Sequence, residues 1–363
     1  MTLRVVQWAT GPVGRHAMAA VVDHPDLELV GCFVYDESKA GRDAGELAGL
    51  DQIGVIATRD REAILALDAD CVLFMAQGDA DPAGALADIC PLLASGKNVI
   101  STAVTPLIYP SAMGDEVVQQ LELACSTGVS SFHATGLQPG WAAEALPMLI
   151  SGLLRSVDSL TVREVFDYAS YDNAFMLFDV MGFGHLPEST DYIAHDPSVL
   201  GGVFRAPIML VADALGATID DWTFTRDVRT CTEPFRIAAG PVEGGTIAAV
   251  RFGATAIVDG RPALSVEHVT RIHPDVAPDW PTGRGWRVTV DGVPSVEVSV
   301  ELAVNGEDEN DQTCIATAMH AIHAVAPVCA AEPGIRTFLD LKTILGRHVL
   351  SRPHRFTDQG GRS

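Results

Sequence analysis

The chain has 363 residues, of which 48% are apolar and 20% are charged, and its mean hydropathy is +0.21. This length and composition allow two domains with large buried cores and exclude global disorder. Lys and Arg number 24 against 47 Asp and Glu, which gives a formal net charge of −23. Because so acidic a chain is repelled by phosphate backbones and anionic lipids, we expect no nucleic acid and no membrane among its partners.

The N-terminal sequence and the cysteines favour a cytoplasmic protein. The start, MTLRVVQWATGPVG, has no basic region followed by a long apolar stretch, so we expect no signal peptide. The seven cysteines form no Cys-x-x-Cys pair, and several lie in apolar runs, where a free thiol packs as a small hydrophobic group. His320 and His323 lie close in sequence but have no third ligand at a suitable spacing. We therefore expect a reduced, cytoplasmic protein that binds no metal.

The first 140 residues alternate short apolar runs with segments of helical pattern. Strands are expected at residues 3–9, 27–35, 71–76, 98–102 and 130–135. Helices are expected between them, at residues 15–24, 82–96 and 115–128. Continuous apolar strands that alternate with helices predict an α/β domain of the Rossmann type, residues 1–140, with a parallel sheet covered on both faces.

The pattern changes after residue 140. A helix is expected at residues 142–154 and a strand at 159–166, followed by a polar-aromatic stretch that begins as a loop. From Thr246 onward, long alternating runs are separated by the Asp-Gly turns of VDGR and VDGV, which predict hairpins. We expect a second α+β domain, residues 141–311, with a mixed or antiparallel sheet. A helical segment at 312–350 is expected to return to the first domain, and residues 351–363 to form a flexible tail.

The turn after the first expected strand carries two glycines, in the sequence TGPVGR. A glycine turn between a strand and a helix is typical of dinucleotide binding, because the helix N-terminus offers free N–H groups to a pyrophosphate. We expect Gly11 to permit the tight turn and Gly14 to let the helix begin close to the phosphates. Position 9, where the full pattern has a further glycine, is Ala9. The expected cofactor contacts here are Gly11, Pro12, Val13, Gly14 and Arg15.

An acidic residue follows the second expected strand at the spacing of a ribose-binding carboxylate. Asp36 comes roughly 20 residues after the glycine turn, where such an acid accepts hydrogen bonds from both ribose hydroxyls and disfavours a 2′-phosphate. Lys39 and Arg42 follow closely and suit a 2′-phosphate. We expect NAD or NADP, with a preference for NAD; an ordinary turn with a solvated acid is the alternative. Ala76, Gln77, Thr102 and Ala103, at the ends of two further strands, are expected along the dinucleotide.

The sequence resembles the dihydrodipicolinate reductase-like family, which includes 2,4-diaminopentanoate dehydrogenase and native amine dehydrogenases, and it is similar to actinobacterial members. The matching stretches include VVQWATGPVGRHA, SGKNVISTAV, FHATGLQPGW and ATAMHAIHAVAPVCAAEPGIRTFLDL, and together they span nearly the whole chain. The resemblance implies an NAD(P)-dependent oxidoreductase that forms a homodimer through the sheet of its second domain. The His-His-x-x-Lys and Ser-Gly-Thr motifs of the lysine-pathway reductase are absent, so we do not expect that activity.

The resemblance also shows a departure at the expected catalytic acid. Val104 stands where amine dehydrogenases of the family have a glutamate that serves the amine chemistry, so other proton donors gain importance. The candidates are Tyr168, at the end of a second-domain strand, and Glu144, at a helix start. Each has a plainer explanation, the packing of an aromatic ring and an interaction with the helix dipole. The expected substrate contacts are Val104, Trp141, Tyr168 and Phe178.

These observations predict reductive amination of a ketone or aldehyde, or the reverse amine oxidation, on a small-to-medium apolar substrate. One alternative is an NAD(P)H-dependent ketone or imine reductase without amine chemistry. Another is a catalytically silent dinucleotide-binding sensor, because the glycine turn is present while the expected carboxylate is not.

Overall fold

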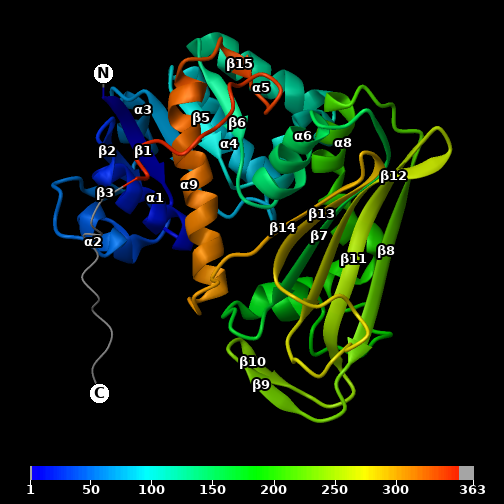
Figure 1. The fold of residues 1–363 in the computed structure, drawn as a ribbon. Helices are drawn as coiled ribbons and strands as arrows, with labels where there is room; N and C mark the ends of the chain where they lie inside the picture. The colour runs from blue at the N-terminus through cyan, green and yellow to red at the C-terminus, as the bar shows by residue number, and fades with distance from the viewer. Residues whose placement is uncertain (1, 351–363) are drawn as a thin grey trace.

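The computed structural model describes residues 2–350, apart from the side chain of Leu200. The strands of this part of the chain form a seven-stranded parallel sheet, a six-stranded mixed sheet and a small two-stranded ribbon, β9 (Phe235–Ile237) with β10 (Gly240–Val242). Figure 1 shows the parallel sheet and the mixed sheet side by side, with the long helix α9 (Glu309–Cys329) lying along the parallel sheet, against which it packs. The predicted combination of a Rossmann-type domain with a second, mixed-sheet domain is confirmed.

The parallel sheet has the strand order β15-β6-β5-β4-β1-β2-β3. The strands are β1 (Leu3–Trp8), β2 (Leu27–Phe33), β3 (Ala57–Thr58), β4 (Cys71–Phe74), β5 (Asn98–Ser101), β6 (Ser131–Ala134) and β15 (Gly334–Ile335). Helices α1 (Pro12–Asp23), α2 (Ala44–Ala48), α3 (Arg61–Ala66), α4 (Pro82–Ala94) and α5 (Asp115–Gly128) connect them. Because β2 and β4 flank β1, the strand order reverses there, and ligands of such sheets bind beyond the carboxyl ends of the strands at that point.

Apolar clusters cover both faces of the parallel sheet. On one face, Val5 and Ile100 pack with Ala17 of α1 and Ile322 of α9. On the other face, the sheet packs against side chains of α4 and α5, including Ile89. Because both faces are covered, the strands read as continuous apolar runs rather than as alternating ones.

The mixed sheet has the strand order β14-β13-β7-β12-β11-β8. Its strands are β7 (Ser156–Asp167), β8 (Asp221–Thr230), β11 (Ile247–Val258), β12 (Arg261–Arg271), β13 (Gly285–Val293) and β14 (Val296–Val300). β7 and β12 are parallel, and the other neighbours are antiparallel. The chain between the sheets and around the mixed sheet forms η2 (Thr105–Ile108), η3 (Pro110–Met113), η4 (Trp141–Ala145), α6 (Leu146–Ser151), η5 (Phe175–Val180), η6 (Ile193–His195), α7 (Pro197–Gly202) and α8 (Arg205–Ala214).

Of the two hairpin turns predicted at Asp-Gly pairs, one forms where it is expected and the other does not. Asp259 and Gly260 form the turn of the β11–β12 hairpin, and both have the positive φ that such a turn requires. The second prediction is misplaced: Gly292 lies inside β13, next to a register shift, and the β13–β14 turn comes after Val293. A Cβ on Gly292 would lie 2.2 Å from the carbonyl oxygen of Ser156, so this glycine serves a close approach of strands rather than a turn.

Helix α9 connects the parts of the molecule on which the candidate site depends. The side chain of Asp311 accepts a hydrogen bond from His16 of α1 at 2.9 Å, and Asn310 donates to Ser170, in the loop after β7, at 2.9 Å. Further along α9, His320 Nδ1 lies 2.7 Å from the hydroxyl of Thr135 at the end of β6. The helix thereby fixes the carboxyl edge of the parallel sheet against the end of β7. No helix within residues 2–350 is long and apolar enough to cross a membrane.

Candidate active site

The glycine turn after β1 is built by close backbone contacts. Ala9 has a φ of +71°, the left-handed conformation that a glycine adopts more easily, and Gln7 Nε2 donates to its carbonyl oxygen at 2.8 Å. A Cβ on Gly14 would lie 2.3 Å from that same oxygen, so only glycine lets α1 begin this close to β1. Gly11 has an ordinary φ of −71°. The tight turn therefore occurs at Ala9 rather than at Gly11.

The N-terminus of α1 fits the phosphates of a dinucleotide. No side chain of residues 2–350 caps this helix end, and a Cβ on Gly11 would meet none of their atoms within 4 Å. Pro12 occupies the first helical position, where its missing N–H is no loss, and Arg15 is exposed beside the turn. Free N–H groups and the positive end of the helix dipole remain for an anionic ligand. These residues would hold the pyrophosphate.

The end of β2 carries both an acidic and a basic group at the edge of this turn. Asp36 is exposed, and its carboxylate accepts hydrogen bonds from the backbone N–H and the hydroxyl of Ser38, both at 2.8 Å, which lower the pKa of Asp36. Lys39 Nζ lies 3.3 Å from the carbonyl oxygen of Thr10 and 3.2 Å from its hydroxyl, over the turn. Arg42 is exposed nearby. An ionised carboxylate thus follows β2, and the cation of Lys39 lies over the glycine turn.

The loops after β4 and β5 are tied together. The N–H of Gly78 donates to the carbonyl oxygen of Ala103 at 3.0 Å, and Asp79 accepts hydrogen bonds from the backbone and the hydroxyl of Thr105 at 2.7 and 2.9 Å. The residues expected along the dinucleotide lie on these two loops: Ala76, Gln77, Thr102 and Ala103. The sequence gives no reason to single out Asp79, whose function is to join the two loops.

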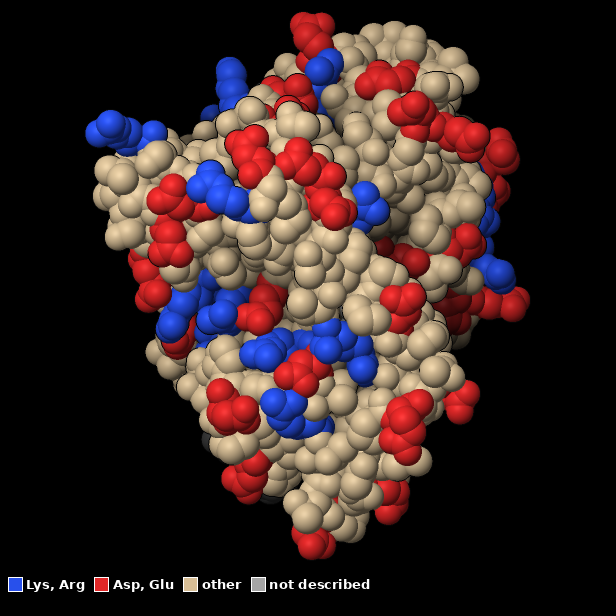
Figure 2. Space-filling model, turned by 90° about the vertical axis from the view of Figure 1, so that its right-hand side faces the viewer, with Lys and Arg blue, Asp and Glu red and all other residues tan. Residues whose placement is uncertain are grey.

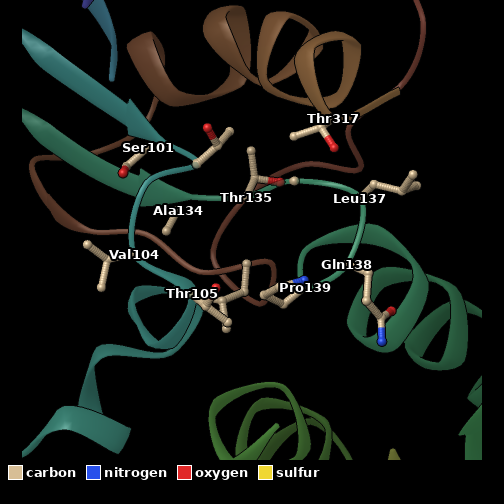
Figure 3. Close-up of a pocket in the computed structure, with 12 residues that line it drawn as sticks. Ser101, Val104, Thr105, Ala134, Thr135, Leu137, Gln138, Pro139 and Thr317 are labelled. Carbon is tan, nitrogen blue, oxygen red and sulfur yellow. The ribbon is translucent and has the colours of Figure 1, made fainter. Parts of the chain in front are cut away.

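A pocket opens at the carboxyl ends of β5 and β6 (Figure 3). It has about 390 Å³ of empty space, part of it open to solvent, and the described residues that line it are all uncharged. Val104 and Thr105 lie on one side of the view and Gln138 on the other, with Thr317 of α9 above them. Val104 is 3% exposed, and its Cγ2 would lie 2.7 Å from a Cβ on Gly78. The wall at the expected acid position is therefore apolar.

The loop of residues 136–140 closes this pocket and rests on Glu144. Gly140 has a φ of +134°, and a Cβ there would lie 2.2 Å from the backbone nitrogen of Gly136, so the loop requires glycine. Glu144 Oε2 accepts a hydrogen bond from the N–H of Gly140 at 2.7 Å, whereas Oε1 has no partner among residues 2–350. Complete burial raises the pKa of Glu144 to about 8, despite this hydrogen bond. A neutral carboxyl group thus lies behind the loop that lines the pocket.

Of the three remaining candidate residues, Trp141 and Tyr168 pack beside this loop, and Phe178 does not. Trp141 and Tyr168 both pack against the cluster that contains Leu137 of the pocket wall and Phe166 of β7. Burial, with Glu164 nearby, raises the pKa of Tyr168 well above its usual value, so its hydroxyl keeps its proton. Phe178 instead packs near Gly184 and Gly240, by the β9–β10 ribbon, and does not line this pocket.

Sequence reasoning missed a buried polar cluster on the mixed sheet. Glu164 accepts hydrogen bonds from His268 Nδ1 at 2.5 Å and from Trp286 Nε1 at 3.0 Å. The available signal is that Glu164 and His268 occupy positions of their strands that lie on the same face as buried apolar residues such as Val162 and Val266. Among residues 2–350, no group of three or more His, Cys, Asp or Glu side chains is arranged to hold a metal ion.

Comparison with known proteins decides the family. Residues 143–351 match the 2,4-diaminopentanoate dehydrogenase C-terminal domain, and residues 5–80 match the dihydrodipicolinate reductase N-terminus. An amine dehydrogenase of Streptomyces virginiae is 38% identical to this chain over 354 residues, which cover 95% of this chain and 98% of that one. The chain belongs to the family of 2,4-diaminopentanoate dehydrogenase and the amine dehydrogenases. It is an NAD(P)-dependent oxidoreductase, and the predicted resemblance is confirmed.

Two further relatives agree with this family assignment. The 2,4-diaminopentanoate dehydrogenase of Acetoanaerobium sticklandii is 26% identical over 252 residues, which cover 67% of this chain and 66% of that enzyme. The solved structure of an amine dehydrogenase from Mycobacterium smegmatis superposes with a TM-score of 0.76 at 19% identity, covering 96% of this chain and 98% of that one. The latter likeness supports the two-domain fold.

Proposed function

We propose that this enzyme joins ammonia to a small-to-medium apolar ketone or aldehyde, or oxidises the corresponding amine. The observation that carries the proposal is the uncharged pocket at the carboxyl edge of the parallel sheet, beside the glycine turn. A bound nicotinamide coenzyme would supply or accept the hydride. The chain's part is to bind the coenzyme at residues 11–15, to hold an apolar carbon skeleton against Val104 and the Leu137 wall that Trp141 packs against, and to handle protons.

Tyr168 and Glu144 are proposed as the proton donors of this reaction. Glu144 is buried and Tyr168 is half-buried, and desolvation raises the pKa of each, so each keeps its proton at neutral pH. A proton donor is needed because the addition of ammonia places negative charge on the carbonyl oxygen, and because this oxygen must leave as water when the iminium forms. Tyr168 packs beside the pocket wall at Leu137, and Glu144 lies behind the loop that bears that wall.

A second candidate function is ketone reduction without amine chemistry. The apolar side chain at Val104 favours it, because the pocket wall then lacks a carboxylate that would stabilise an iminium cation. The variant Val104→Glu tests whether the protein catalyses either reaction or has no catalytic activity. A gain in ammonium-dependent turnover supports the amine reaction, and a wild-type protein and variant that both leave every carbonyl unreacted contradict any catalytic role.

Coenzyme preference is the first property to measure. We propose a preference for NAD, because the ionised Asp36 accepts hydrogen bonds and disfavours a 2′-phosphate. Titration with NADH and then with NADPH, followed by nicotinamide fluorescence, gives the two dissociation constants. Tighter binding of NADH supports the role of Asp36. Tighter binding of NADPH would mean that Lys39 and Arg42 bind the 2′-phosphate. Binding of neither coenzyme would contradict the proposed reaction.

We also propose a cytoplasmic homodimer that pairs through the open face of the mixed sheet. This face carries polar, half-buried side chains in register, with ion pairs from Arg163 to Glu267 at 2.5 Å and from Arg251 to Asp227 at 3.1 Å. Figure 2, which views the side where β8 lies, shows basic and acidic side chains interspersed. A second copy of the chain would cover this face. Light scattering that gives 38.5 kDa, the mass of one chain, at working concentration would contradict the dimer.

A further inference from the structure

A carboxylate lies one hydrogen bond behind the wall of the pocket. Thr105 lines the pocket, and its hydroxyl donates a hydrogen bond to Asp79 Oδ2 at 2.9 Å. The backbone N–H of Thr105 donates to the other carboxylate oxygen, Oδ1, at 2.7 Å. Figure 3 shows Thr105 on the same side of the pocket as Val104. Asp79 itself does not line the pocket, so its contact with a bound ligand would pass through Thr105.

The bond to Asp79 fixes how the hydroxyl of Thr105 can meet a ligand. A hydroxyl has one proton to donate and two lone pairs with which it accepts. Because the proton of Thr105 is directed at Asp79, its oxygen is left as an acceptor only. The negative charge of the carboxylate also polarises the O–H bond, which makes the oxygen a stronger acceptor. Thr105 therefore suits a ligand group that carries N–H bonds and a positive charge.

The other hydroxyls of the pocket have different partners. The lining hydroxyl groups are those of Ser101, Thr102, Thr105, Thr135 and Thr317. Ser101 Oγ accepts the N–H of Ala103 at 3.1 Å, which leaves its proton to be donated elsewhere. Thr135 is hydrogen-bonded to His320 Nδ1 at 2.7 Å, and burial lowers the pKa of His320 to about 3, so that ring is neutral. Among these hydroxyls, and within residues 2–350, Thr105 is the one with a carboxylate partner.

The backbone around Thr105 and Asp79 leaves the pair little freedom. The N–H of Gly78 donates to the carbonyl oxygen of Ala103 at 3.0 Å. A Cβ on Gly78 would lie 2.7 Å from Cγ2 of Val104, so the two loops are in direct contact. Joining the loops is one result of the bonds to Asp79. The other result is that the carboxylate and the hydroxyl stay paired at the pocket wall.

The proposed amine reaction needs such a group at this place. The substrate nitrogen carries a positive charge as an ammonium or an iminium, whereas the described residues that line the pocket are all uncharged. Val104, at the expected position of the acid, is apolar. Thr105 is the next residue, and its oxygen joins the pocket wall to the negative charge of Asp79. A fixed charge and dipole directed at a cationic nitrogen stabilise it without reorganisation.

We propose that the hydroxyl of Thr105, oriented and polarised by Asp79, binds the nitrogen of the substrate amine and of its iminium. This inference rests on the proposed amine reaction. The substrate N–H donates to Thr105 Oγ1, while the hydroxyl of Thr105 continues to donate to Asp79, so no proton has to move. Thr105 contacts the substrate, and Asp79 is a positioning residue. The pair supplies the negative potential that Val104 does not.

Four variants test this role. Thr105→Val removes the hydroxyl and nearly keeps the shape, and Thr105→Ser keeps the hydroxyl. Asp79→Asn keeps one oxygen for the backbone N–H of Thr105 but places an amide NH₂ at its hydroxyl, which would turn the hydroxyl proton toward the pocket. The matched control is Thr317→Val, which removes another hydroxyl from the wall of the same pocket.

The measurement compares two probes of similar size, one with N–H bonds and one without. Cyclohexylamine is titrated into the complex of the protein with reduced coenzyme, and cyclohexanone into the complex with oxidised coenzyme. Neither pair can react, so calorimetry gives true dissociation constants. Thermal unfolding and the dissociation constant of the coenzyme are measured for every variant alongside.

The expected result is a loss of the preference for the amine. Thr105→Val should bind cyclohexylamine about tenfold more weakly, the usual effect of losing a hydrogen bond to a charged group, and cyclohexanone within about twofold of the wild type. Asp79→Asn should weaken the amine at least as much and strengthen the ketone, because the hydroxyl then donates into the pocket. Thr105→Ser should keep most of the wild-type preference. Thr317→Val should change the two probes alike, because a hydroxyl without a carboxylate partner can turn to either.

Other outcomes overturn the inference or the function separately. If Thr105→Val and Asp79→Asn weaken both probes alike, Asp79 only joins the loops, and the inference is rejected while the proposed function stands. A loss of the amine preference in Thr317→Val instead of Thr105→Val also rejects it. If Asp79→Asn does not fold, the contrast between Thr105→Val and Thr105→Ser decides. A preference for cyclohexylamine that depends on Thr105, in a protein that oxidises no primary amine of a panel, supports this binding role and rejects the proposed reaction.

Discussion

The two ends of the candidate active site are built on different physical principles. The coenzyme end uses a contiguous segment, residues 9–14, in which backbone atoms approach so closely that Gly14 has no room for a Cβ. The substrate end uses side chains from three distant segments, represented by Val104, Leu137 and Thr317. The first depends on backbone atoms that leave no space for a side chain, and we propose that the second depends on single polar atoms such as the hydroxyl of Tyr168. Each end should therefore fail in its own way when it is altered.

The largest effect is expected at the coenzyme end, from Gly14→Ala. Its Cβ would lie 2.3 Å from the carbonyl oxygen of Ala9, and backbone atoms cannot move away as a flexible side chain can. We expect a loss of about 1–3 kcal/mol of unfolding free energy and at least tenfold weaker coenzyme binding. Gly11→Ala is the control, because no described atom lies within 4 Å of that Cβ. Equal stability losses in the two variants would contradict this account.

At the substrate end, Tyr168→Phe removes one oxygen and keeps the ring. The ring retains its packing against Phe166 and His268, so the melting temperature should change little. We expect kcat to fall about 100-fold with little change in KM, as for the loss of a proton donor. Steady-state kinetics with the best carbonyl substrate and ammonium measure both constants. An unchanged kcat would show that Tyr168 only packs.

Glu144 offers a pH test of the same end. Its pKa rises to about 8 in the folded protein, because the buried carboxyl resists ionisation. The native state then holds a proton that the unfolded chain releases from about pH 4.5 upward. This contribution to stability is complete below that pH and is lost progressively as the pH rises to about 8.

Calorimetry from pH 5 to 9 measures that effect against Glu144→Gln, which cannot ionise. We expect the melting temperature of the wild type to fall with pH relative to that of the variant, by several degrees in total. Glu116→Gln, at an exposed position, is the control and should parallel the wild type. Parallel curves for the wild type and Glu144→Gln would place the titration of Glu144 in its ordinary range.

The smallest effect is expected from Asp36→Asn, which leaves the turn intact and changes one charge at its edge. The variant should bind NADH several-fold more weakly and NADPH more tightly, because the carboxylate no longer disfavours a 2′-phosphate. Fluorescence titration of both coenzymes measures the ratio of dissociation constants. A ratio equal to that of the wild type would mean that Asp36 serves only the hydrogen bonds to Ser38.

The sequence predicts the coenzyme end well because its determinants are local. The strand, the glycines and the helix are neighbours in the chain, so their spacing predicts their geometry, although the tight turn falls at Ala9 rather than at Gly11. The alternating strands likewise predict the mixed sheet. The turn predicted at Gly292 is wrong because an Asp-Gly pair at a close approach of two strands cannot be told from an Asp-Gly turn by sequence.

The substrate end could be predicted only in part, because long-range pairing assembles it. The resemblance indicates Trp141 and the end of a second-domain strand indicates Tyr168, and both pack against one cluster, but Phe178, in an equally apolar segment, packs elsewhere. The contact of Glu164 with His268 depends on the parallel pairing of β7 with β12, which no local pattern specifies. Polar residues at inward positions of two strands are the one local sign of it.

The most direct test of the central claim is the dependence of NADH and NADPH oxidation on ammonium, with a panel of apolar ketones and aldehydes. We expect that at least one carbonyl compound is turned over only when ammonium is present, with the amine as the product. Oxidation at the same rate without ammonium, with an alcohol as the product, would contradict the amine reaction and make the protein a carbonyl reductase.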